Sequence, residues 1–170
     1  EAAVSPLELF FDLVFVFAVT QVTASLAHDL TMTGLLRALI VFWLVWWAWT
    51  QYTWSLNEAD TEHGWIRLIT LLATALAFLM AVTVPLIITE WGWLFALAYL
   101  VLRMVGISLQ FRLAGDDIVW SRSVRTWAMM SSLGLLAILA AMFLPPDRRF
   151  LALGAAALLD VTAALRAGRS

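Results

Sequence analysis

Three ionisable side chains lie inside runs of the sequence that are otherwise apolar: Asp12, Arg103 and Asp160. If these runs are helices, Arg103 and Asp160 fall within about 3–4 Å of the middle of their runs. Each would cost about 2.5–3.5 kcal/mol if it faced lipid, so both should face protein. Asp12 lies about 8 Å from the middle of its run, and its short side chain reaches poorly towards lipid headgroups. Charges buried in membrane helices commonly mark paths for ions or protons, which is the chemistry that these residues predict.

Another carboxylate, Glu8, precedes Asp12 by one helical turn. Ser5, Pro6 and Glu8 have the spacing of a helix start, in which serine caps, proline takes the first helical position and glutamate bonds back to the cap amide. This spacing favours a structural role for Glu8. Binding of a coupling ion or a substrate is the alternative.

The fourth apolar run carries several polar or small residues on one helical face. They are Tyr99, Arg103, Gly106 and Gln110. In the sixth run, alanines at four-residue spacing flank Asp160 and would allow another helix to approach closely. All three buried charges should lie in the same half of the membrane, so we expect Arg103 to pair with Asp12 or with Asp160.

The predicted layer holds more acids than bases. If Glu8, Asp12 and Asp160 face one arginine, at least one carboxylate is left to bind a cation or to take a proton. The residues of the predicted buried polar site carry charges, hydroxyls or amides: Glu8, Asp12, Gln21, Tyr52, Asn57, Tyr99, Arg103 and Asp160. They predict a protein that moves or senses a small cation, a proton or a polar solute. The alternative is a structural or regulatory membrane protein whose charges only fix helix packing.

Four tryptophans are unusual because they lie inside the second apolar run: Trp43, Trp46, Trp47 and Trp49. We expect them to fill the bundle. A surface on which a cation or an aromatic ligand stacks is the alternative.

Enzyme chemistry is disfavoured by what the sequence offers. The chain has no cysteine, and its two histidines, His28 and His63, should lie on opposite membrane faces. Ser131 and Ser132 are expected to bond to carbonyls of their own helix, so no Ser-His-Asp triad can be assembled. We therefore expect no catalytic residues, no cofactor, no metal site and no nucleic-acid partner.

The elements that must position these side chains follow from composition. Of 170 residues, 64% are hydrophobic and 13% are charged, which excludes an ordinary soluble domain. At about 20 residues per span, the sequence predicts an all-α, polytopic membrane helix bundle. Its six transmembrane helices, joined by short loops into antiparallel hairpins, form a single domain over 1–170. The predicted spans are 6–28, 34–56, 65–89, 91–111, 124–144 and 149–166.

The arginines predict the orientation of this bundle. Six lie on the side of the two termini: Arg67, Arg112, Arg122, Arg125, Arg166 and Arg169. Three lie on the other side: Arg37, Arg148 and Arg149. Because positive charge is enriched in cytoplasmic loops, we expect both termini in the cytoplasm.

The opening stretch, residues 6–21, resembles the signature of the bacterial low temperature requirement protein A (LtrA) family. Further agreement lies in residues 46–54, 57–61 and 98–103. The positions that match the family's motifs are Glu8, Phe11, Asp12, Gln21, Tyr52, Asn57, Asp60, Tyr99 and Arg103. The resemblance implies a multi-pass protein of the bacterial inner membrane, linked by name to growth in the cold, without an established activity.

Members of that family are about twice this length. The resemblance therefore implies that the chain is an amino-terminal half, and that the missing carboxy-terminal half is a partner besides the lipid bilayer.

Overall fold

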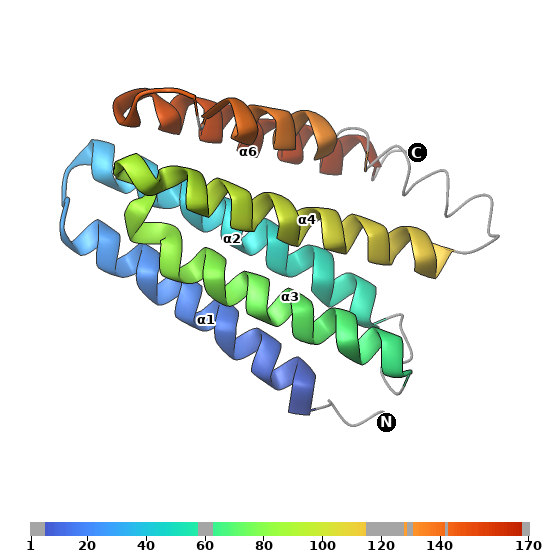
Figure 1. Ribbon diagram of the computed structural model, residues 1–170. Helices are drawn as coiled ribbons and strands as arrows, with labels where there is room; N and C mark the ends of the chain where they lie inside the picture. The colour runs from blue at the N-terminus through green and yellow to red at the C-terminus, as the bar shows by residue number, and fades with distance from the viewer. Residues whose placement is uncertain (1–5, 58–62, 115–127, 129–130, 142, 168–170) are drawn as a thin grey trace.

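The computed structural model describes residues 6–57, 63–114, 128, 131–141 and 143–167, and these residues form an all-helical bundle without strands (Figure 1). The α-helices are α1 (Pro6–Ala27), α2 (Met32–Asn57), α3 (Gly64–Thr83), α4 (Trp93–Ala114) and α6 (Pro146–Ala167). Two short 3₁₀ helices, η1 (Val84–Ile88) and η2 (Glu90–Gly92), connect α3 to α4. A further apolar helical segment covers Ser131–Ala141. Ser5, the predicted cap of α1, lies outside the described residues.

Four helical stretches within the described residues are long and apolar enough to cross a membrane: Pro6–Ala27, Met32–Asn57, Gly64–Ile88 and Glu90–Leu113. Their outward side chains are large and apolar, as in Leu13, Leu68 and Leu79, which suits contact with lipid. The predicted all-α fold is confirmed for the described residues, and the four long apolar stretches fit a membrane protein. The six-span hairpin topology stays a prediction.

The helices are packed so that α1 and α4 lie against α3, while α2 contacts α1, α4 and α6. Small buried residues of α3, such as Ala73, Ala77 and Ala81, allow close approach by its neighbours. The buried hydroxyls of Thr70 and Thr74 donate to carbonyls one turn earlier in α3, so they add no unsatisfied group to this interface. The helix α6 contacts α2 and η1 and lies on the far side of the bundle from α1 (Figure 1).

The predicted third span, 65–89, is not one continuous α-helix. α3 ends at Thr83, and the chain continues as the 3₁₀ helix η1. Pro85 lacks a backbone N–H and clashes with a continuing α-helix. The Thr83 hydroxyl bonds back to the Leu79 and Met80 carbonyls at this point.

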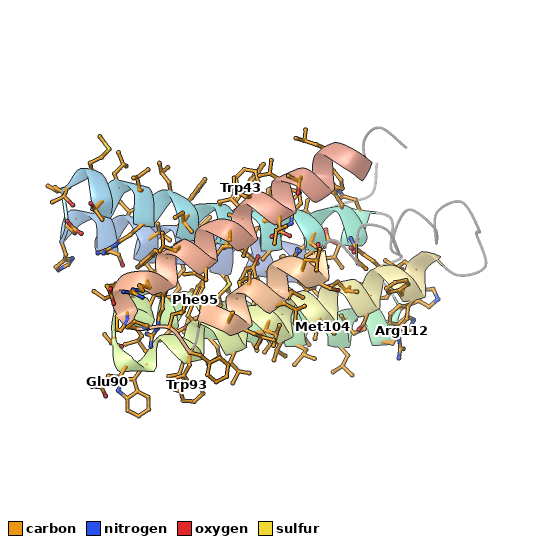
Figure 2. The ribbon with its side chains drawn as sticks, turned by 90° about the horizontal axis from the view of Figure 1, so that it is seen from above. Trp43, Glu90, Trp93, Phe95, Met104 and Arg112 are labelled. Carbon is orange, nitrogen blue, oxygen red and sulfur yellow. The ribbon has the colours of Figure 1, made fainter. Side chains whose placement is uncertain are left out.

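Arg149 joins the start of α6 to this 3₁₀ region. Its side chain donates to the carbonyls of Leu144, at 3.1 Å, and Ile87, at 3.2 Å, and also to that of Thr89. The residue is only 8% exposed. Arg149 therefore belongs to the packed interior at this end of the bundle, rather than to the exposed loop in which its charge was counted. Glu90 and Trp93 lie at the same end, and Arg112 lies at the other end of α4 (Figure 2).

Candidate functional site

Arg103, near the middle of α4, is the centre of the buried polar contacts and has no exposed surface. Its Nη1 donates to Gln51 Oε1 of α2 at 2.8 Å. Its Nη2 donates to Ser131 Oγ at 3.0 Å and lies 3.4 Å from Asp160 Oδ1 of α6, with which it forms an ion pair. One guanidinium thus connects α4 with three other helical elements. We call these four residues the Arg103 network.

Two tyrosines border the Arg103 network. Tyr52 is completely buried and donates its hydroxyl to the Leu102 carbonyl at 2.6 Å, which joins α2 to α4. Tyr99 is also completely buried, one helical turn before Arg103, and its hydroxyl has no partner among the described residues. The network therefore lies within the core, away from the lipid-facing surface.

Two glycines lie beside the network, and Gly106 is the one that makes room for it. A Cβ at Gly106 would lie 2.7 Å from the Gln51 side-chain amide. A Cβ at Gly134 would lie 3.5 Å from Asp160 Oδ1. The glycine at position 106 is what lets Gln51 lie against α4 and reach the arginine.

Four buried polar atoms on α2 and α4 have no hydrogen-bond partner among the described residues: Trp43 Nε1, Gln51 Nε2, Tyr99 Oη and Gln110 Oε1. Trp43, Trp47 and Gln51 follow one another at four-residue spacing and so share a face of α2. The rings of Trp43 and Trp47 stack at 5.7 Å, and Figure 2 marks Trp43. Gln51 Nε2 belongs to the Arg103 network and Tyr99 lies one helical turn from Arg103, and both atoms can donate a hydrogen bond. Trp43 and Gln110 lie about two helical turns from Gln51 and Arg103 along their helices.

Several predicted site residues lie elsewhere. Asp12 is exposed on α1 and accepts a hydrogen bond from Trp49 Nε1 at 2.8 Å. Gln21 is half-buried on α1, and Asn57 is exposed as the last residue of α2. Glu8 is half-buried in the first turn of α1.

Of the two pairings left open by the sequence, the structure contains the one between Arg103 and Asp160. The predicted convergence of three buried charges was wrong for Asp12, because α1 turns that carboxylate to the outside. The excess of acid over base around Arg103 is accordingly smaller than the sequence predicts.

Sequence reasoning missed two contacts of Arg103. Ser131 accepts a hydrogen bond from Arg103, while Ser132 bonds back to the Ala128 carbonyl at 2.7 Å, as expected; the residue one turn before Ser131 lies outside the described residues. Gln51 was not among the predicted site residues. A signal was present, because an amide beside a tyrosine inside a span must find a partner.

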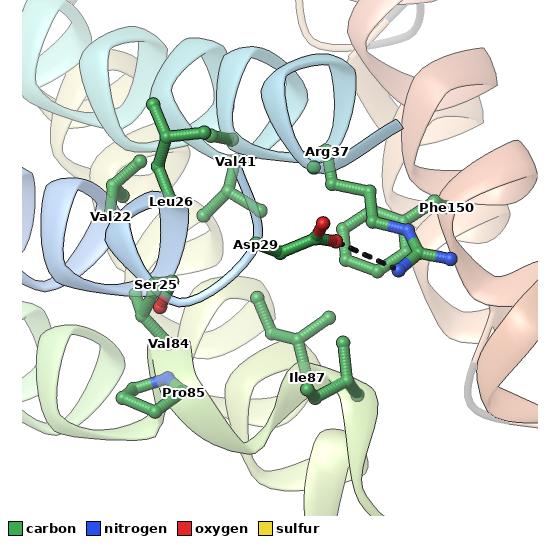
Figure 3. Close-up of a pocket in the computed structure, with 13 residues that line it drawn as sticks. Val22, Ser25, Leu26, Asp29, Arg37, Val41, Val84, Pro85, Ile87 and Phe150 are labelled. Carbon is green, nitrogen blue, oxygen red and sulfur yellow. Dashed lines mark ion pairs between the residues drawn. The ribbon is translucent and has the colours of Figure 1, made fainter. Parts of the chain in front are cut away.

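A second group of polar residues lies at the opposite end of the bundle from the termini. There a cavity of about 90 Å³ opens between α1, α2, η1 and α6 (Figure 3). At its edge Asp29 and Arg37 form an ion pair at 3.8 Å, and Arg37 lies 5.1 Å from the centre of the Phe150 ring. Both charged side chains are more than a third exposed, so this pair is a weak, solvent-screened contact. No metal-ligand cluster occurs among the residues that the structure describes.

A family model described as "Bacterial low temperature requirement A protein (LtrA)" matches residues 3–170. The chain belongs to the LtrA family. The resemblance of residues 6–21 is thereby confirmed, and the apolar helices agree with a membrane protein.

One curated relative of this LtrA chain is an uncharacterized protein, RA0937, from Rhizobium meliloti (strain 1021). The two are 38% identical over 92 residues, a stretch that covers 54% of this chain and 22% of the relative. The match therefore spans less than a quarter of the relative's length. No solved structure gives a significant match.

Proposed function

We propose that this LtrA chain is a multi-pass protein of the bacterial inner membrane whose Arg103 network is a site for a proton or a small polar solute. Movement or sensing of that species is the function we assign to it. The observation that carries the proposal is the buried ion pair of Arg103 and Asp160, near which two buried donors, Gln51 Nε2 and Tyr99 Oη, have no partner among the described residues.

The chemistry of the site favours some ligands over others. Asp160 is neutralised by Arg103 at 3.4 Å, and Asp12 lies outside the network, so a metal cation finds few negative ligands there. The two unpartnered atoms near the pair, Gln51 Nε2 and Tyr99 Oη, can both donate a hydrogen bond. A proton shared by the Asp160 carboxylate, or a neutral solute with acceptor oxygens, suits this arrangement better than a metal cation.

A second function is supported by another observation. Arg103 contacts three other helical elements at once, and neither Arg103 nor Asp160 lines any of the three cavities described for this bundle. A closed contact of this kind would hold the helices in register in a membrane protein that transports nothing.

Proton flux into liposomes separates the two functions. We expect Asp160→Asn to abolish the pH-dependent signal of an enclosed pH-sensitive dye. Asp29→Asn, which changes the exposed pair at the bundle end, should leave the signal intact. Equal flux with and without the Asp160 carboxylate would reject the assignment of the proton to this residue. The structural function would be favoured if the wild-type chain gave no proton flux above that of empty liposomes and a double variant, Arg103→Met with Asp160→Leu, still folded.

The proposed orientation can be tested by labelling because the chain has no cysteine. With both termini in the cytoplasm, a single cysteine at Leu30 should react with an impermeant maleimide added outside the inner membrane. One placed at Gly64 should react only after the membrane is opened. The reverse pattern would contradict the orientation predicted from the arginines.

A further inference from the structure

A groove of about 350 Å³ lies between α1 and α2, separate from the Arg103 network. Its lining combines one carboxylate, aromatic rings and valines: Asp12, Phe15, Val16, Val19, Phe42, Val45, Trp46 and Trp49. Val16, Phe42 and Trp46 are among the exposed apolar side chains of the bundle. The groove therefore opens on the outer surface, and its volume is typical of a pocket for a small organic molecule.

The carboxylate in this groove has a defined position. Trp49 Nε1 donates to Asp12 Oδ1 at 2.8 Å. Given the bounds of α1 and α2, both residues lie about 7 Å from the middle of their helices, at 1.5 Å per residue, on the side of the termini. Trp49 thus holds an exposed carboxylate at a depth where water is scarce.

An exposed carboxylate inside a membrane span is costly unless it meets an opposite charge or further donors. Asp12 is too short to carry its charge to the headgroups. The groove lining contains no basic residue. A positive charge from outside the bundle would therefore complement this site.

The aromatic lining indicates what kind of positive charge fits. Phe15, Phe42, Trp46 and Trp49 place four rings beside one carboxylate. Aromatic faces attract cations, and organic cations are bound in this way more readily than metal ions, which require several oxygen ligands. The valines of the groove suit an apolar body attached to that charge.

We propose that the α1–α2 groove binds a lipophilic organic cation that enters from the membrane. Asp12 supplies the opposite charge, Trp49 fixes the carboxylate, and Phe42 and Trp46 contact the apolar body. The Arg103 network has no part in this binding, so the groove and the proposed function can fail independently.

Two ions of the same shape and opposite charge test the proposal. The chain in nanodiscs of zwitterionic lipid would be titrated with radiolabelled tetraphenylphosphonium and, in parallel, with tetraphenylborate. We expect saturable binding of the phosphonium only. Asp12→Asn should weaken it by at least about tenfold, and Trp49→Phe, which retains a ring but removes the donor, by a few-fold. Asp29→Asn, which changes the carboxylate of the other cavity, should have no effect.

Three results would overturn the proposal. They are equal uptake of both ions, phosphonium binding that survives Asp12→Asn, and a groove that is already covered by a second copy of the chain and binds neither ion. If Asp12→Asn does not fold, Trp46→Leu keeps the carboxylate and removes an exposed ring. It should weaken phosphonium binding by a few-fold, and unchanged affinity would count against the proposal.

Discussion

Two buried arginines stabilise two regions of this bundle, one end and the centre, by different means. Arg149 donates to three backbone carbonyls where the chain passes through 3₁₀ helices. Arg103 donates to side chains, those of Gln51, Ser131 and Asp160. The partners of Arg149 are backbone atoms, which a substitution does not remove. The partners of Arg103 are side chains, and each of them can be replaced.

The backbone around Arg149 requires hydrogen-bond donors, whereas the backbone around Arg103 does not. A break in an α-helix leaves carbonyls without donors, and an arginine with several N–H groups satisfies them. At Arg103 the helix is continuous, and nothing in the α4 backbone requires a charge there. A buried arginine–aspartate pair at such a place is therefore the better candidate for function.

The largest expected effect comes from removing one charge of the pair at the bundle centre. Arg103→Met leaves Asp160 buried without its counter-charge, so the free energy of unfolding should fall by about 3–5 kcal/mol. Denaturant titration in detergent micelles, followed by circular dichroism, measures it.

The matched control replaces both charges. Arg103→Met with Asp160→Leu should recover most of the lost free energy, because two apolar groups of similar size can replace a buried pair. If the double variant is as unstable as the single one, the pair is not the main partner of either residue.

A smaller loss is expected at the other arginine. Arg149→Met leaves carbonyls of Ile87, Thr89 and Leu144 without this donor, at a cost of about 2–3 kcal/mol by the same measurement. No second side-chain substitution should restore it, since the partners are backbone atoms. Arg148→Met is the control, because Arg148 is 69% exposed and its contact with Asp147 is 3.8 Å long. If a second side-chain substitution restored the stability of Arg149→Met, the proposed difference between the two arginines would be wrong.

The smallest effect concerns the space beside Arg103. The methyl group introduced by Gly106→Ala would displace the Gln51 amide and lower the free energy of unfolding by about 1 kcal/mol. Gly64→Ala, at a position with no atom within 4 Å of the new Cβ, should change it by less than about 0.5 kcal/mol. Equal changes in the free energy of unfolding at both glycines would show that Gln51 can move without a loss of stability.

The sequence predicts the helices well, because long apolar runs leave few other solutions in a membrane. The predicted spans 6–28 and 34–56 agree with α1 and α2 to within about two residues. The third span, 65–89, agrees with the helical stretch Gly64–Ile88. Its last part is a 3₁₀ helix instead of an α-helix because of Pro85.

The site was harder to predict than the helices. Periodicity places Tyr99, Arg103 and Gly106 on one face of α4, and the structure has Tyr99 and Arg103 completely buried. Periodicity does not specify how α1 is rotated about its axis, because α1 is apolar on all sides. Asp12 was therefore predicted to lie in the core instead of on the surface. The contact of Ser131 with Arg103 was not predicted, because a serine hydroxyl can accept from a neighbouring helix as well as donate to its own.

The two arginine contacts also determine how α6 is held. Arg149 fixes the helix near its first turn, and Asp160 fixes it about 16 Å further along, at 1.5 Å per residue. Because these two contacts lie at separate points along α6, the helix cannot rotate about its axis or slide lengthwise unless one of them breaks. Loss of the Asp160 contact alone would leave α6 held by Arg149 near its first turn and by its packing against α2.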